Sequence, residues 1–148
     1  MEVEWKIKSF KELSLIELYQ TLQLRSEVFV VEQNCVYQDI DNKDQKAMHL
    51  MGSYEGQIVA YARLFKPGDY FQQASIGRVV IAKKFRNRQW GHDLMREALV
   101  GIRKHFSQTK ITISAQLYLK KFYETHGFLS EGETYLEDDI PHIKMCRE

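Results

Sequence analysis

The first residues of the chain alternate between apolar and polar side chains. Val3, Trp5 and Ile7 hold the apolar positions, and this period of two is typical of a half-buried strand. A helix is predicted next, because Ser14 and Glu17 have the spacing of a capping box. Its apolar face is expected to comprise Leu15, Leu18, Tyr19 and Leu22. The helical pattern continues through LRSEVFVVEQ and ends in a polar loop, NCVYQDIDNKDQK.

The middle of the chain predicts three strands and an amphipathic helix. MHLMGSY and QIVAYARLF are strand-like, and Glu55-Gly56 between them favours an antiparallel hairpin. QASIGRVVIA predicts a further strand after the breaker Pro67-Gly68. A basic turn follows, and apolar residues then recur at helical spacing at Leu94, Met95, Ala98, Leu99, Ile102 and Phe106.

The last third of the chain alternates strands with one short helix. KITISAQ predicts a strand, and LYLKKFYETHGF predicts a helix that stops at Gly127, where a left-handed C-cap residue fits. Two strands around 128–135 and 140–145 flank the acidic turn LEDD. The order β-α(α)-β-β-β-α-β-α-β-β predicts an α/β fold. No repeat, low-complexity segment or linker divides residues 1–148, so one domain is expected.

Composition narrows the function classes. Lys and Arg nearly cancel Asp and Glu, and the formal charge of +1 provides no overall field for nucleic acid or anionic membranes. Cys35 and Cys146 lie far apart without metal-ligand spacing, so neither a disulfide framework nor a metal site is expected. No segment approaches the roughly 20 apolar residues of a membrane helix. These features predict a soluble, cytoplasmic protein.

The basic turn KKFRNRQWGHDL lies between a buried strand and a helix. A helix N-terminus presents unpaired N–H groups and a positive dipole end, which suits phosphate. Gly91 would allow close backbone approach, and Lys83, Lys84, Arg86 and Arg88 would add charge. The alternative is a solvated basic loop. Neither GxxxxGK[ST] nor GxGxxG is present, so a nucleotide P-loop is excluded.

Tyr123 precedes the Gly127-Phe128 helix stop by four residues. A tyrosine there is usually a core residue. With the basic turn and this helix in the observed order, however, the chain resembles the GCN5-related N-acetyltransferase (GNAT) family, most closely its ElaA-like branch. The resemblance rests on RNRQWG after VVI, and on LRSEVFVVEQNCVYQDID, VAYARL, IGRVVI and YLEDDIPHIKM, and it covers nearly the whole chain.

The resemblance implies the GNAT fold, with a central twisted mixed sheet flanked by helices, and acetyl-CoA as the acyl donor. In this family a strand backbone pairs with the pantetheine arm and the following turn holds the pyrophosphate. The implied cofactor-binding residues are Val79, Val80, Ile81, Asn87, Arg88, Gln89, Trp90, Gly91, His92 and Gln116. Gln116 could equally be a surface amide. Gln89 departs from the family pattern, because the first glycine of the motif is usual there.

Acetyl transfer to an amine requires an oriented donor, a neutral amine and a proton for the departing thiolate. Tyr123 matches the tyrosine that the family uses as general acid. A tyrosine of pKa about 10 is a weaker acid than a thiol of about 8.5, so proton donation is uphill by roughly 2 kcal/mol. Glu32, His142 and His49 are candidate bases, although each could be structural, and no motif assigns the base.

The acceptor side is expected to be formed by two segments that carry acidic residues. Asp39 and Asp41 lie in YQDID, and Glu137, Asp138 and Asp139 lie in YLEDD. Converging carboxylates would attract a cationic amine, and solvated turns are the alternative. Arg25, Arg63 and Arg78 could pair with these carboxylates or hold a substrate carboxylate. The predicted substrate-binding residues are Arg25, Glu32, Gln33, Asp39, Asp41 and His142.

The sequence therefore predicts an acetyl-CoA-dependent N-acetyltransferase whose acceptor is a small-molecule or peptide amine. Two other readings stay open: a non-catalytic acyl-CoA-binding or regulatory module, and an acyl-homoserine lactone synthase-like acyltransferase. Nucleic acid and membranes are not expected as partners. A homodimer is compatible with the sequence, which does not determine the oligomeric state.

Overall fold

A computed structural model describes residues 2–148 of the chain. Its element order matches the predicted succession of strands and helices. No helix in this part of the chain is long and apolar enough to cross a membrane. The strands are β1 (Glu4–Ser9), β2 (Met48–Tyr54), β3 (Gln57–Phe65), β4 (Ser75–Ile81), β5 (Ile111–Gln116), β6 (Leu129–Glu137) and β7 (Ile140–Arg147). The helices are α1 (Leu15–Arg25), α2 (Trp90–Phe106) and α3 (Lys120–Glu124), with a π-helical segment, η2 (Ser26–Glu32), extending α1 and a 3₁₀ segment, η4 (Lys83–Arg88), preceding α2.

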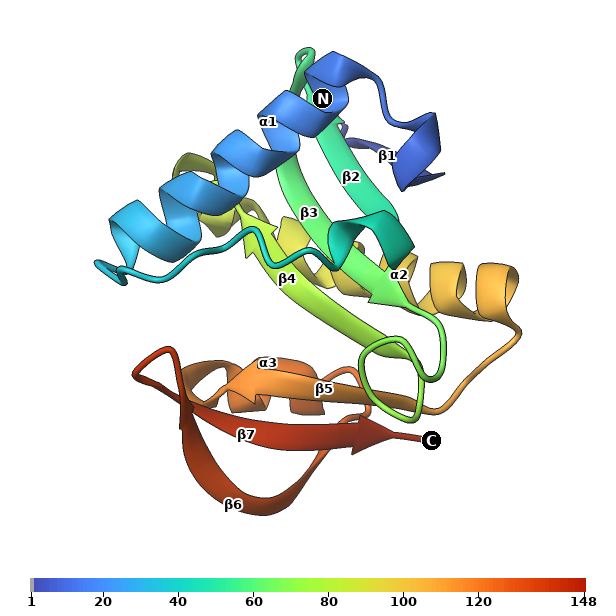
Figure 1. Cartoon of the computed structure of the whole chain (residues 1–148), viewed down its shortest axis with the longest axis vertical. Coiled ribbons are helices and arrows are strands. Elements are labelled where there is room, and N and C mark those ends of the chain that lie inside the picture. Colours follow the sequence, from blue (N-terminus) through green and yellow to red (C-terminus); the bar gives the residue numbers. More distant parts are fainter. Residues whose placement is uncertain (1) are drawn as a thin grey trace.

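The strands form two antiparallel sheets, in the orders β1-β2-β3-β4 and β5-β7-β6. One parallel bridge, between Ala74 and Ile111, joins them, and the Thr112 N–H donates to the Ala74 carbonyl at 2.9 Å. The expected mixed sheet is thus present as two halves. Figure 1 shows β4 and β5 diverging from the bridged end. No pairing links β4 itself to β5 among residues 2–148.

A β-bulge bends β4 next to this opening. Tyr61 is paired with Val80 whereas Arg63 is paired with Gly77, so β4 carries one more residue than β3 between these pairs. Arg78 lies in the bulge with a left-handed φ of 50°. A bulge increases local twist and redirects the strand. The split between the two sheets therefore has a local backbone cause.

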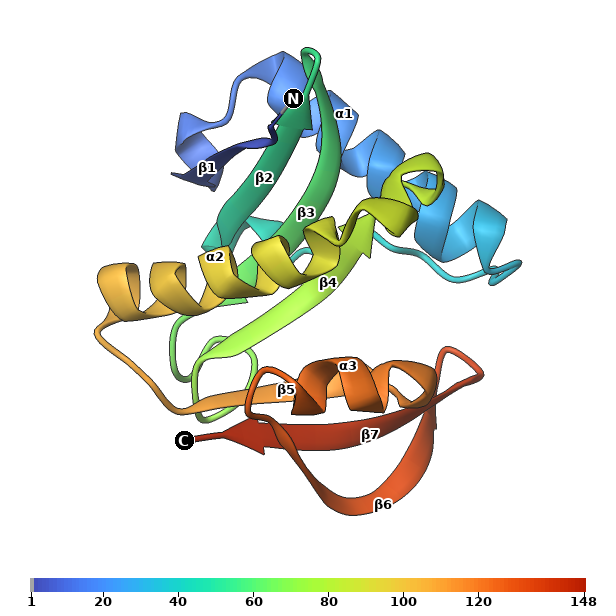
Figure 2. The ribbon, with the colours of Figure 1, turned by 180° about the vertical axis from the view of Figure 1, so that it is seen from behind.

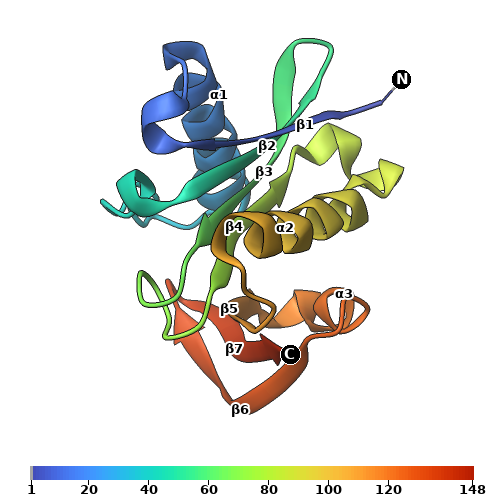
Figure 3. The same ribbon diagram turned by 90° about the vertical axis from the view of Figure 1, so that its right-hand side faces the viewer.

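Helices cover both faces of the first sheet, with α1 on one side and α2 on the other (Figure 3). Figure 2 shows α2 crossing β2, β3 and β4, and α3 lying over β5 and β7. The predicted apolar face of α2 is confirmed, since Leu94, Met95, Ala98 and Ile102 are fully buried. These residues form the main core together with both sheets.

The predicted apolar face of α1 is wrong at Leu15 and Tyr19, whereas Leu18 and Leu22 are partly buried and the capping box of Ser14 and Glu17 is confirmed. Leu15 and Tyr19 are 84% and 71% exposed. The helix instead buries Thr21, Leu24 and Arg25. The buried face of α1 thus includes a charged side chain, and a prediction that relies on apolar residues alone does not find such a face.

Two turns follow the predicted chemistry. Glu55 and Gly56 both have positive φ, as required for a tight hairpin between β2 and β3. Gly127 has a φ of 90° after α3, and the Phe128 N–H donates to the Tyr123 carbonyl at 3.2 Å. This C-cap fixes the end of the helix that carries Tyr123.

Candidate active site

A cleft of about 340 Å³ lies where β4 and β5 diverge. Both sheets line it, together with η2, the loop after η2, α2 and α3. Nine predicted site residues reach it: Gln33, Asp39, Val79, Val80, Ile81, Gly91, Gln116, Tyr123 and His142. The cleft lining does not include Arg25, Glu32, Asp41, Asn87, Arg88, Gln89, Trp90 or His92.

The turn between β4 and α2 explains how Gln89 replaces the expected glycine. Gln89 adopts a left-handed conformation, with φ 64° and ψ 14°, and α2 begins at the next residue. This conformation costs a residue with a Cβ about 1 kcal/mol or more. Gly91 faces the cleft, where an added Cβ would lie 3.5 Å from the Phe122 ring. The N-terminus of α2 thus has the geometry of an anion site.

The two arginines of this turn have protein partners. Arg86 binds Glu32 through both terminal guanidinium nitrogens, and its Nε donates to the Ile81 carbonyl at 3.0 Å. The hydrogen bond from Arg86 lowers the pKa of Glu32. Glu32 is therefore a weak proton acceptor that stabilises the turn from η2.

Arg88 lies among three aromatic rings. Its guanidinium carbon is 5.1–5.4 Å from the ring centres of Tyr54, Phe85 and Trp90. Cation–π contacts of this kind contribute about 0.5–1 kcal/mol each at exposed sites. Arg88 therefore ties η4 and the start of α2 to the β2–β3 hairpin.

Tyr123 is 5% exposed and lines the cleft from α3. Its ring packs edge-on against Phe122 and Phe128, which holds the side chain in place. Its hydroxyl has no hydrogen-bond partner among residues 2–148. Burial raises the pKa of Tyr123, so the phenol stays protonated over the physiological pH range.

Hydrogen bonds join the two sides of the cleft. The side-chain amides of Gln33, after η2, and Gln116, at the end of β5, bind each other reciprocally at 3.1 and 3.4 Å. The Cys35 thiol donates to the Asp138 carbonyl at 3.2 Å, and the Tyr37 hydroxyl donates to Asp139 at 2.8 Å. The loop after η2 therefore joins the two sheets. The sequence placed Gln33 and Gln116 in the site but gave no sign that they pair.

A second polar group lies on the β5-β7-β6 sheet. Ser114 Oγ donates to Glu137 at 2.9 Å and also bonds the Tyr135 hydroxyl. His142 is 5% exposed, and its Nε2 is 3.6 Å from Glu137 Oε2. Ser114 and Tyr135 were not among the site residues predicted from the sequence. Ser114 lies between buried residues of β5, which was an available signal, whereas no residue of β6 is buried.

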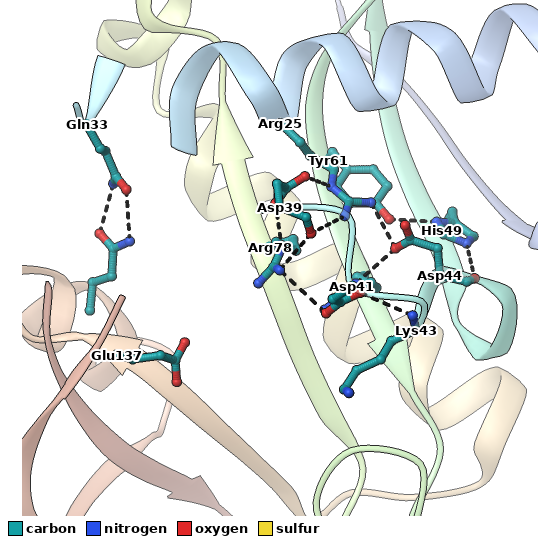
Figure 4. A network of polar contacts seen from close by, with 12 residues as sticks. Arg25, Gln33, Asp39, Asp41, Lys43, Asp44, His49, Tyr61, Arg78 and Glu137 are labelled. Atoms are coloured by element: carbon teal, nitrogen blue, oxygen red, sulfur yellow. Dashed lines mark hydrogen bonds and ion pairs between the residues drawn. The ribbon is translucent and has the colours of Figure 1, made fainter. Parts of the chain in front are cut away.

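Three arginines and three aspartates form a network beside β4 (Figure 4). Arg25 binds Asp39 at 2.8 Å and Asp44 at 2.9 Å. Arg63 binds Asp41 at 2.8 Å and shares Asp44, also at 2.9 Å. The charges of the six groups cancel. The expected acidic attraction by Asp39 and Asp41 is thus neutralised by arginines.

The third arginine and a buried histidine complete the network. Arg78, in the bulge, lies 2.7 Å from Asp39 and donates to its carbonyl at 2.9 Å. His49 bonds the Tyr61 hydroxyl at 2.6 Å and the Asp44 carbonyl at 2.9 Å, and it is 1% exposed. Burial lowers the pKa of His49, which makes it a neutral core residue away from the cleft. The network holds the bulge in place.

Comparison with known proteins agrees with this geometry. Residues 15–148 match the acetyltransferase (GNAT) domain family. The chain belongs to the GNAT family. Protein ElaA of Escherichia coli K12 is 42% identical over 99% of the chain and 97% of its own length. A UPF0039 protein of Schizosaccharomyces pombe is 41% identical over the same shares.

Solved structures of GNAT relatives have the same fold. An acyl-CoA N-acyltransferase from Pseudomonas aeruginosa has a TM-score of 0.93 and 44% identity, with 99% of each chain covered. The crystal structure of E. coli ElaA has a TM-score of 0.92 and 41% identity, again over 99% of each chain. The predicted family, ElaA-like resemblance and GNAT fold are confirmed.

The likeness to acyl-homoserine lactone synthases is limited to the fold. A CoA-dependent enzyme of that kind has a TM-score of 0.78 but 14% identity, and the chain covers 82% of it. The closer relatives make the chain a GNAT acyltransferase, which uses an acyl-CoA donor and an acceptor substrate.

Proposed function

We propose that this chain is a single-domain N-acetyltransferase that moves the acetyl group of acetyl-CoA directly to a primary amine. The observation that carries the proposal is the cleft between β4 and β5, which is lined both by Gly91 at the N-terminus of α2 and by Tyr123. We expect the enzyme to act in the cytoplasm, and a homodimer stays a prediction.

Acetyl-CoA fits two features of the cleft. The edge of β4 that faces β5 is unpaired beyond the Ala74 bridge among residues 2–148. Apart from the Ile81 carbonyl, which accepts from Arg86, this edge of Val79–Ile81 offers backbone groups to an extended pantetheine arm. The backbone from Asn87 to His92, with Gln89 left-handed and Gly91 lacking a side chain, would hold the pyrophosphate. Gln116 would flank the donor from β5.

Tyr123 would act on the departing thiolate. Tyr123 is a mostly buried residue whose phenol is protonated at physiological pH, and a hydrogen bond to developing charge is stronger there than in bulk water. Its raised pKa makes full proton transfer more uphill than in water. We therefore expect the phenol to hydrogen-bond the thiolate first and to release its proton late.

The acceptor would enter from the side of Gln33 and His142, which both line the cleft. Arg25, Asp39 and Asp41 would build the wall of this side through their network. Among the candidate bases His142 is the better placed, because Glu32 is engaged by Arg86 outside the cleft lining.

Substitution of Tyr123 by Phe tests the catalytic role. The assay is release of free CoA from acetyl-CoA with polyamines, amino acids, aminoglycosides and peptide N-termini as acceptors. We expect kcat to fall about 100-fold or more with the active amine, the usual range for loss of a general acid. Tyr19→Phe, on the exposed side of α1, is the matched control. An unchanged rate and pH profile in Tyr123→Phe would show that the role is wrong.

Measuring both acetyl-CoA binding and CoA release distinguishes an enzyme from a non-catalytic acyl-CoA-binding module. Calorimetric binding of acetyl-CoA without CoA release on any amine would favour the module. Gly91→Leu would place a side chain between the α2 N-terminus and the Phe122 ring, so it should weaken acetyl-CoA binding without unfolding the protein. Unaltered affinity would refute the phosphate assignment.

A further inference from the structure

The β5-β7-β6 sheet presents one polar face to the cleft. Gln116 lies opposite His142, and His142 lies opposite Tyr135. Directly opposed residues of antiparallel strands place their side chains on the same face, and Ser114 shares that face because it is two residues from Gln116. Three strands therefore bring these polar side chains together beside Glu137.

Hydrogen bonds fix the proton positions in this group. His142 Nδ1 lies 2.7 Å from the carbonyl oxygen of Ile140. A carbonyl only accepts, so Nδ1 carries a hydrogen and neutral His142 keeps its lone pair on Nε2. That nitrogen faces Glu137 Oε2 at 3.6 Å. When His142 is neutral, these two acceptors face each other, and a donor placed between them would bond to both.

Glu137 also has its negative charge available. No Arg or Lys forms an ion pair with it among residues 2–148, whereas the cleft-lining Asp39 is held by Arg25 and Arg78. Ser114 orients the carboxylate without neutralising it. Its side chain is 37% exposed, so an incoming group can reach it. A cation with N–H donors matches both the charge and the two acceptors.

A substrate carboxylate has no comparable partner at this end of the cleft. Arg25 and Arg63 are 1% exposed and engaged by aspartates. Arg78 lines the cleft, but Asp39 and Asp41 bind its guanidinium. A carboxylate next to the reacting amine would also be repelled by the carboxylate of Glu137.

We propose that Glu137 and His142 together bind the primary ammonium group of the acceptor, and that His142 Nε2 takes its proton. The acceptor class is then alkylamines and polyamines without a carboxylate near the reacting nitrogen. This inference rests on the proposed function and names the acceptor side of the same site. Glu137 becomes a further catalytic residue, since it contacts the reacting nitrogen and stabilises the imidazolium of His142.

The proton and electron pairs balance in this arrangement. The ammonium gives one proton to His142 Nε2, and the neutral nitrogen attacks the thioester carbonyl carbon. The C–N bond forms and the C–S bond breaks, with the electron pair leaving on sulfur. Sulfur takes the phenol proton of Tyr123, and the second proton of the attacking nitrogen restores the phenol. His142 then releases its proton to solvent.

The acceptor class is tested with pentylamine and norleucine, which carry one amine each and differ by the carboxylate beside it. Both are assayed by CoA release alongside polyamines, aminoglycosides and peptide N-termini. We expect kcat/KM for pentylamine to exceed that for norleucine by about 10-fold or more, because the carboxylate beside the amine would be repelled by Glu137. Equal values, or a preference for norleucine, would overturn the assignment of the class.

The role of Glu137 is tested with Glu137→Gln on the best amine. We expect kcat/KM for the amine to fall about 10- to 100-fold while KM for acetyl-CoA stays within about twofold, because one charged hydrogen bond is lost on the acceptor side only. Glu133→Gln, on the exposed part of the same strand, should match the wild type.

The outcomes separate the two proposals. Equal kinetics of Glu137→Gln and Glu133→Gln, with Tyr123→Phe impaired, would overturn the role of Glu137 and leave the acetyltransferase intact. Wild-type protein that binds acetyl-CoA but acetylates no amine would overturn the proposed function itself, and the inference with it. His142→Asn should reduce kcat for the amine without altering acetyl-CoA binding, and normal turnover would refute its base role.

Discussion

Asp44 joins two buried arginines, and Asp44→Asn is the sharpest test of the charge network. Its Oδ1 accepts hydrogen bonds from Arg25 and Arg63, each at 2.9 Å. Burial alone would raise the pKa of Asp44, but the two arginines outweigh it and lower that pKa. Asparagine keeps the shape and the acceptor oxygen while removing the charge. Three arginines would then face only Asp39 and Asp41.

The magnitude follows from burial. Removing one partner of a buried ion pair destabilises a protein by about 3–5 kcal/mol, because a charge is left uncompensated. The Asn oxygen retains neutral hydrogen bonds worth about 1 kcal/mol. We therefore expect the free energy of unfolding to fall by about 3 kcal/mol. In a chain of 148 residues this corresponds to a Tm lower by about 6–12 °C.

Urea unfolding followed by circular dichroism measures this loss as a lower midpoint with an unchanged slope. Asp93→Asn, which breaks an exposed ion pair with Arg96, is the control and should change stability by less than about 0.5 kcal/mol. A loss below about 1 kcal/mol in Asp44→Asn, similar to the control, would refute the view that this network stabilises the fold.

Three further variants test local features. Burial alone would raise the pKa of Asp41, but Arg63 outweighs burial and lowers this pKa to about 2. The stability that the Asp41 carboxylate adds to the fold is therefore complete above about pH 4 and is lost as the pH falls toward 2. In Asp41→Asn the free energy of unfolding should lose roughly 2 kcal/mol less between pH 4 and pH 2 than in the wild type, as measured by urea unfolding at several pH values. An unaltered pH dependence would contradict the lowered pKa of Asp41. Gln89→Gly should be more stable than Gln89→Ala by about 1 kcal/mol, because only glycine adopts φ 64° freely; equal midpoints would argue against the left-handed turn. Gly101→Ala should destabilise the protein by about 1 kcal/mol despite better helix propensity, since its Cβ would lie 2.6 Å from Ile7, and a thermal scan showing a higher Tm would contradict this packing.

The parts of the site predicted from sequence are those with a local chemical signature. The glycine at 91 and the C-cap at Gly127 lie within short segments whose backbone demands are visible in the residues, whereas the left-handed conformation of Gln89 is known only from the structure. The helix that carries Tyr123 and the strand before the turn follow from hydrophobic periodicity. These features placed Tyr123 and the turn in the right order along the chain.

The sequence did not predict which polar residues neutralise each other. The Arg25–Asp39–Arg78 contacts join α1, the polar loop and β4, and each residue alone was compatible with substrate binding. The apolar face of α1 was misplaced for the same reason, because burial of Arg25 depends on carboxylates distant in the chain. Glu137 and His142 became a pair only through the register of β6 and β7.

The sequence by itself determined the succession of strands and helices, the buried face of α2, the special turns and the membership of the GNAT family. All of these depend on residue periodicity or on backbone conformations within a few neighbouring positions. Tertiary structure alone decided that β4 bends away from β5 and that Asp39 and Asp41 pair with arginines while Glu137 has no arginine or lysine partner among residues 2–148. The net charge around a carboxylate and its exposure to a substrate both depend on residues from distant segments of the chain, so they are set only when the chain folds.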